Sequence, residues 1–227
     1  MPEPTDAGGV AEPAGTPPEF TLTVPVNWCQ LDLDPRTRAE TIARLVEERF
    51  GAAPGQELRE ARRELTAMLR RYARQAASRG AVYAALMYQE VEGLSLSASL
   101  LVAVGEAPRD AAGRPVLDPA ALGRIMSGLA DAGAPAAADR PPADLFETPA
   151  GTAARLRRTT DSGFAGTDGR TVVTAETQYF VPVPGTDKVL ALTFSTPNLP
   201  ARQILEELFD AIAGTLAWVW SAGQAPP

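Results

Sequence analysis

Hydrophobic and polar positions follow two different periods along this chain. Near the start they alternate, which is the pattern of a strand, and the apolar members are Phe20, Leu22, Val24 and Val26. Apolar residues then recur at helical spacing over two stretches. These predict one helix with Asp34 as N-cap, Pro35 as its first residue and Gly51 at its end, and a second helix from Gly55 to about Arg79.

Strand patterning returns in two long segments, Ala81 to Val91 and Leu94 to Val104, whose connection at Glu92-Gly93 predicts a hairpin. One face of the second strand is apolar throughout. Its other face begins with serines and becomes apolar at Leu101. We therefore expect that end of the hairpin to be covered on both faces.

The last third predicts strands near 152–160, 170–182 and 188–195, followed by a helix after Pro200 whose apolar stripe extends to Val219. A short helix is expected around 119–130, inside a flexible excursion near 105–144. Residues 1–18 lack apolar periodicity and are expected to be disordered. The chain thus predicts one α+β domain over 19–222, with a single antiparallel sheet of about five to seven strands flanked by helices.

Composition narrows the possible functions. The 227 residues include no histidine, one cysteine (Cys29) and one lysine (Lys188). Histidine is the commonest general base and metal ligand, so Ser-His-Asp and Cys-His catalysis and most zinc sites are excluded. We predict a protein that is not an enzyme, with no cofactor and no metal, and in which Cys29 is a buried small apolar residue.

The net charge of −7 argues against binding to nucleic acid or to a membrane surface, both of which require a basic protein surface. The N-terminal segment has no basic region followed by an apolar run, and no stretch approaches the length of a membrane span. The predicted location is therefore the cytoplasm. Twenty arginines against one lysine indicate GC-rich coding, as in actinobacteria.

Two segments resemble the Mog1/PsbP-like family. One is the opening strand and turn from Phe20 to Trp28, with a Pro-x-x-Trp motif, and the other is the closing strand and helix from Lys188 to Trp218. The resemblance implies an α/β/α sandwich and a role in binding and assembly, including bacterial secretion accessories. The family shares no catalytic residues, so the resemblance implies none here.

The second predicted helix carries the strongest candidate for a binding surface. It holds seven arginines against three glutamates, a net charge of +4 in an acidic protein. Four of the arginines project within about 60° of one another, opposite the apolar stripe. They form the arginine stripe, which consists of Arg59, Arg63, Arg70 and Arg74. Guanidinium groups suit carboxylates or phosphates, so the stripe predicts an acidic protein or phosphate partner; the alternative is an ordinary solvated face.

Trp218 is a second candidate. On the predicted final helix it lies away from the apolar stripe, and an exposed tryptophan would favour an interface with a partner. The alternative is a last turn that folds back onto the domain.

Other patterns leave alternatives open. Arg155 and Arg157 share one face of a predicted strand, which suits either an edge strand protected from aggregation or a face that meets acids. A small-molecule or lipid carrier is the alternative function, with a cavity near the aromatic residues Tyr83, Tyr88, Tyr179 and Phe180. A carboxylate-dependent hydrolase would need acids such as Glu90, Glu92 and Glu176 to converge. The turns at Asp161, Asp168 and Asp187 lack calcium-loop spacing.

Overall fold

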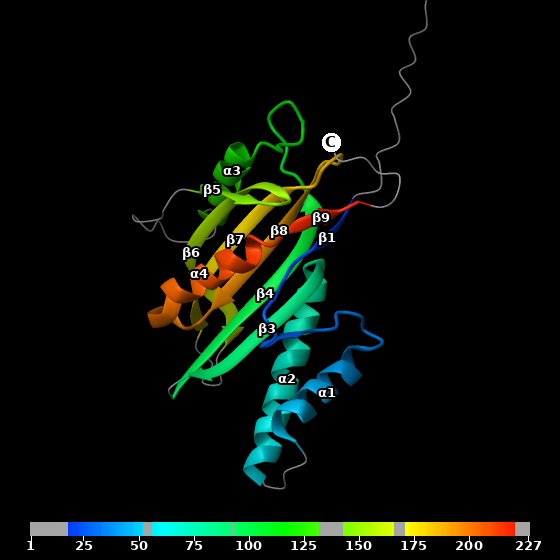
Figure 1. The fold of residues 1–227 in the computed structure, drawn as a ribbon, viewed down its shortest axis with the longest axis vertical. Helices are drawn as coiled ribbons and strands as arrows, with labels where there is room; N and C mark the ends of the chain where they lie inside the picture. The colour runs from blue at the N-terminus through cyan, green and yellow to red at the C-terminus, as the bar shows by residue number, and fades with distance from the viewer. Residues whose placement is uncertain (1–17, 52–55, 92, 132–142, 166–170, 221–227) are drawn as a thin grey trace, which may run out of the picture.

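The computed structural model describes residues 18–51, 56–91, 93–131, 143–165 and 171–220 (Figure 1). The helices are α1 (Arg38–Phe50), α2 (Gln56–Ser78), α3 (Pro119–Asp131) and α4 (Arg202–Ala213), with the short 3-10 helix η1 (Leu199–Ala201) before α4. The strands are β1 (Glu19–Thr21), β2 (Trp28–Gln30), β3 (Ala81–Val91), β4 (Leu94–Glu106), β5 (Asp144–Thr148), β6 (Gly151–Ala165), β7 (Thr171–Pro182), β8 (Lys188–Thr196) and β9 (Ala217–Val219).

Seven strands form one antiparallel sheet in the order β2-β3-β4-β8-β7-β6-β5. The β3–β4 hairpin joins the later strands because β4 pairs with β8, with Val102 opposite Leu192. The predicted antiparallel sheet with flanking helices is therefore confirmed. The first strand differs from the prediction, because β1 is short and pairs with β9 in a separate two-stranded sheet.

Helix α4 covers one face of the sheet and packs through aromatic rings. Phe209 of α4 stacks on Phe194 of β8 with ring centroids 4.8 Å apart, and the Trp28 ring meets both of them edge-on. The other face carries two apolar clusters, one beneath α1 and α2 and one beneath α3. Figure 1 shows α4 on the near side of the sheet and α2 behind β3.

The alternation along β4 explains how both faces are filled. Leu100 and Val102 are fully buried in the cluster that contains α4, whereas Leu101 packs against the cluster that contains α2. The expected covering of both faces at this end of the hairpin is confirmed. Gly93 has a φ of 80°, in the left-handed region that suits glycine at the hairpin turn.

The start of α1 differs from the prediction. The helix begins at Arg38, with Thr37 at the N-cap position, so the assignment of Asp34 as N-cap and Pro35 as first residue was wrong. The Asp34 carboxylate accepts a hydrogen bond from the Arg36 backbone N–H at 2.9 Å and also binds the Arg36 guanidinium. Residues 35–37 thus form a turn closed by Asp34, whose carbonyl oxygen also accepts a hydrogen bond from the Arg38 backbone N–H at 2.9 Å, and α1 begins directly after this turn.

The end of α4 also differs. The helix stops at Ala213, and residues 217–219 leave it to form β9, so the predicted helical stripe up to Val219 was wrong beyond Ala213. The Thr215 hydroxyl accepts a hydrogen bond from the Thr23 backbone N–H at 2.9 Å, next to the β1–β9 ladder. Pairing with a strand near the N-terminus thus replaces the last helical turns.

Parts of several predictions lie outside the described residues, namely residues 1–17 and most of the stretch between α3 and β5. None of the helices in the described ranges is long and apolar enough to cross a membrane.

Candidate functional site

Helix α2 presents two different faces. Leu69, Tyr72, Ala73 and Ala76 are buried against α1 and the sheet. Burial raises the pKa of Tyr72 to about 12, and a hydrogen bond with Ser99 of β4 acts in the opposite direction. The packed face thus anchors α2 and fixes the direction in which its opposite face points.

The four arginines of the stripe are all exposed on the opposite face of α2, as the helical spacing predicted. None of the four forms an ion pair with a carboxylate among the side chains that the structure describes. Their neighbour Arg62 behaves differently. It is half-buried, and its Nη2 lies 3.6 Å from the Glu47 carboxylate of α1, so it ties the two helices together.

A shallow depression of about 280 Å³ interrupts the arginine stripe at its middle. Its lining consists of Arg62, Arg63, Thr66, Ala67 and Arg70. The stripe is therefore two arginine pairs on either side of a site with small side chains.

Trp218 does not share this surface. It lies on β9, is half-buried, and packs against the apolar cluster on the α4 face of the sheet. Its Nε1–H donates a hydrogen bond to the Ala150 carbonyl oxygen at 2.8 Å. Helix α2 covers the opposite face, so the structure does not bring Trp218 together with the arginine stripe.

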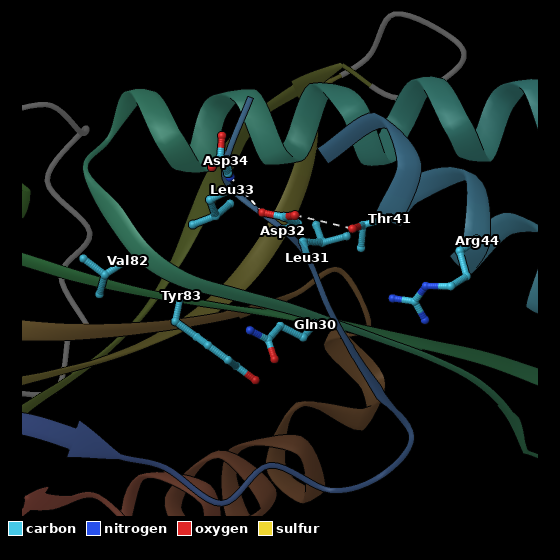
Figure 2. Close-up of a pocket in the computed structure, with 9 residues that line it drawn as sticks. All are labelled: Gln30, Leu31, Asp32, Leu33, Asp34, Thr41, Arg44, Val82 and Tyr83. Carbon is cyan, nitrogen blue, oxygen red and sulfur yellow. Dashed lines mark hydrogen bonds between the residues drawn. The ribbon is translucent and has the colours of Figure 1, made fainter. Parts of the chain in front are cut away.

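A second, larger depression of about 460 Å³ lies between β3 and the segment from β2 to α1 (Figure 2). Gln30, Asp32, Arg44 and Tyr83 are among its polar lining residues. The Asp32 carboxylate accepts hydrogen bonds from the Asp34 backbone N–H at 2.9 Å and from the Thr41 hydroxyl at 3.4 Å.

The carboxylates of Asp32 and Asp34 organise the turn before α1. The pKa of Asp32 is lowered, chiefly by a hydrogen bond from the Thr37 side chain, and the pKa of Asp34 is lowered, chiefly by Arg36. Both carboxylates are thus stabilised in their charged form by groups of the same segment. Within the described residues, no group of three or more potential metal-ligating side chains is present, in this depression or elsewhere.

The structure shows a charged network that the sequence indicated only in part. Arg155 and Arg157 of β6 both donate hydrogen bonds at 2.8 Å to one carboxylate oxygen of Asp210 on α4. The Arg155 Nε–H also donates to Asp144 of β5 at 2.9 Å, and the Tyr179 hydroxyl donates to Asp210. The explanation of an edge strand holds only in part, because β5 pairs with residues 151–155 of β6. Arg155 therefore lies inside the sheet, whereas Arg157 lies on a stretch that pairs, among the described strands, with β7 alone. The alternative, a face that meets acids, is correct.

Other candidate residues are dispersed. Cys29 is exposed on the edge strand β2, which contradicts its expected burial. Glu176 pairs with Arg158 at 2.5 Å and Asp187 with Arg109 at 3.1 Å, while Glu92 and Asp168 lie outside the described residues.

The aromatic residues of the carrier hypothesis do not gather around one space. Tyr179 belongs to the cluster on the α4 face and its neighbour Phe180 to the cluster beneath α3, as the alternation of a strand requires. Tyr88 is 52% exposed. Between the sheet and α4, the rings pack in direct contact with one another.

No family model matches the sequence, and no curated protein matches it significantly. Among solved structures, the chain is similar to the crystal structure of LpqN, involved in cell envelope biogenesis of Mycobacterium tuberculosis. The identity is 13% and the TM-score 0.46, over 92% of this chain and 87% of that chain. A protein of Bacteroides thetaiotaomicron VPI-5482 gives 10% identity and a TM-score of 0.30, over 63% of this chain and 47% of that chain. Similarities at this level assign no function, and the Mog1/PsbP-like resemblance stays a prediction.

Proposed function

We propose that this protein is a non-enzymatic interaction module that binds an acidic segment of another protein through the arginine stripe of α2. One observation carries the proposal: the four guanidinium groups are exposed in a row and have no carboxylate partner among the described side chains. By contrast, Arg155, Arg157 and Arg158 of β6 all form ion pairs within the protein.

Electrostatics favour a protein partner with a local acidic patch. The molecule as a whole carries a charge of −7 and repels polyanions at long range, whereas the stripe concentrates positive charge along one helix. A planar guanidinium can bind a carboxylate through two parallel hydrogen bonds. Such contacts fix orientation and steer association, and they weaken as salt is added.

The proposed setting is an adaptor role in a bacterial assembly, for example a secretion system, in the cytoplasm. The setting rests on the resemblance to the Mog1/PsbP-like family and on the sequence patterns described above. Because the chain has no histidine, the proposal assigns it no catalytic role.

The test is co-purification from the native host with two variants that carry the same net charge. Arg63→Glu/Arg70→Glu reverses the centre of the stripe, and Arg44→Glu/Arg124→Glu reverses two exposed arginines on α1 and α3. Wild type and the control variant should recover the same stoichiometric partner, and the stripe variant should recover at least about tenfold less. Cross-linking should place the stripe against an acidic segment of that partner.

Circular dichroism and thermal unfolding accompany the experiment, because the substituted side chains are exposed and the fold should persist. Equal recovery of the partner by all three proteins would show that the stripe is only a solvated helix face.

A further inference from the structure

The centre of the stripe offers an apolar contact between two charged flanks. The Thr66 hydroxyl donates a hydrogen bond to the Arg62 carbonyl oxygen at 2.7 Å, so it is engaged within the helix. Ala67 is exposed and contributes only a methyl group. A partner that enters this depression therefore meets the Thr66 side chain and the Ala67 methyl group between arginines. Arg62, whose Nε and Nη2 have no hydrogen-bond partner among the described residues, also lines it.

The four arginines of the stripe are spaced symmetrically along α2. The stripe arginines are separated by four, seven and four residues, which corresponds to rises of about 6, 10.5 and 6 Å along the helix axis. A helical partner with acids at the same spacing presents all four on one face, because 100° per residue keeps them within about 60°. The inner two acids are seven residues apart, and the residue three positions after the first of them lies within about 20° of the same face.

An extended partner cannot match both pairs. At about 3.3 Å per residue, 6 Å corresponds to two residues, which lie on the same side of a strand, but 10.5 Å corresponds to three. Successive side chains of a strand alternate, so the second pair of acids would point away from α2. The symmetric spacing of the stripe thus selects a helix.

We propose that the acidic segment is an α-helix that lies along α2, with carboxylates on both arginine pairs and one apolar side chain in the depression at Ala67. This inference rests on the function proposed above and names the form of its partner. The apolar residue adds affinity because it is removed from water on binding. It also fixes how the partner helix is aligned along α2, because it fits only at the depression.

Designed peptides test the inference. Both are alanine-based helices of about 20 residues with four glutamates at the spacing of the stripe. One carries leucine three positions after the second glutamate, and the other carries alanine there. Calorimetric titration at low ionic strength should show that wild-type protein binds the leucine peptide at least about fivefold more tightly than the alanine peptide. Ala67→Gln, a good helix former at an exposed position, should abolish that difference and keep binding to the alanine peptide.

The outcomes separate this inference from the function on which it rests. Equal affinity of wild type for the two peptides, or a leucine preference that persists in Ala67→Gln, would show that no apolar side chain binds in the depression at Ala67. Either result would leave charge-driven binding to the stripe intact. A peptide of the same composition with its glutamates spread around the helix should bind at least about fivefold more weakly; equal binding would overturn the helical match. If Arg63→Glu/Arg70→Glu binds the alanine peptide as wild type does, both proposals are wrong.

Discussion

At the scale of single residues, Asp210 provides the negative charge that pairs with two arginines lying side by side inside the fold. Arg155 is largely buried, with only 13% of its side chain exposed, and Arg157 lies beside it on the same face of β6. Their repulsion is offset because the Asp210 carboxylate accepts a hydrogen bond from each and another from Tyr179. Burial, followed by these contacts with Asp210, raises the pKa of Tyr179 and keeps its hydroxyl protonated as a donor.

Asp210→Asn is expected to destabilise the protein strongly. The amide keeps the size of the side chain but removes the charge that two partly buried guanidinium groups require, so the free energy of unfolding should fall by about 2–4 kcal/mol. Urea denaturation measures the change. Glu207→Gln is the control, since Glu207 is exposed on the same helix and its substitution should change stability by less than about 0.5 kcal/mol. Similar effects of the two substitutions would show that the network contributes little.

At the scale of elements, the close approach of α3 to the sheet depends on Gly123. A Cβ atom at this position would lie 2.8 Å from the Cβ of Ala143 and 3.2 Å from the Cβ of Ala154 on β6. Gly128 lies on the same helix, where a Cβ atom would meet nothing within 4 Å. The two glycines therefore share an element but not a packing role.

The same substitution at these two glycines should have opposite effects. Gly123→Ala forces α3 away from β6 and should lower the free energy of unfolding by about 1–3 kcal/mol, despite the better helix propensity of alanine. Gly128→Ala should raise it by about 0.5–1 kcal/mol, because the propensity gain meets no clash. Thermal unfolding of both variants distinguishes them. Stabilisation by Gly123→Ala would mean that α3 is free to shift on the sheet.

At the scale of the whole molecule, stability is concentrated in the middle of the sheet. β4 and β8 pair with each other and have a further strand on each side, and Leu100, Leu192 and Phe194 are fully buried there. The β1–β9 pair contains only three residues in each strand. The free energy of local opening is lowest where few buried contacts must be broken.

Hydrogen exchange should reflect this gradient. Backbone amides of β4 and β8 are expected to exchange at least about a hundredfold more slowly than those of β1 and β9, because the central strands open only with the global transition. Mass spectrometry of the full chain at several exchange times provides the measurement. If β9 were as strongly protected as β8, the two sheets would unfold as one cooperative unit.

The sequence predicted well those helices, strands and turns whose formation depends on residues close to one another in the chain. The apolar stripe of α2, the alternation along β4 and the glycine at the hairpin turn are set by helix and strand periodicity, so their positions agree closely with the structure. Helical spacing also determined that the stripe arginines share one exposed face. These are properties of segments shorter than about 25 residues, for which backbone geometry dictates side-chain direction.

Contacts between distant segments were decided only by the tertiary structure. Asp210 reaches Arg155 across 55 positions of sequence, and β9 forms because β1 offers its edge, which ends α4 early and turns Trp218 inward. The acids that pair with Arg155 and Arg157 come from β5 and α4, so the sequence showed two arginines on one face but not what meets them. Periodicity specifies which way a side chain points, whereas its partner depends on how all the elements pack together.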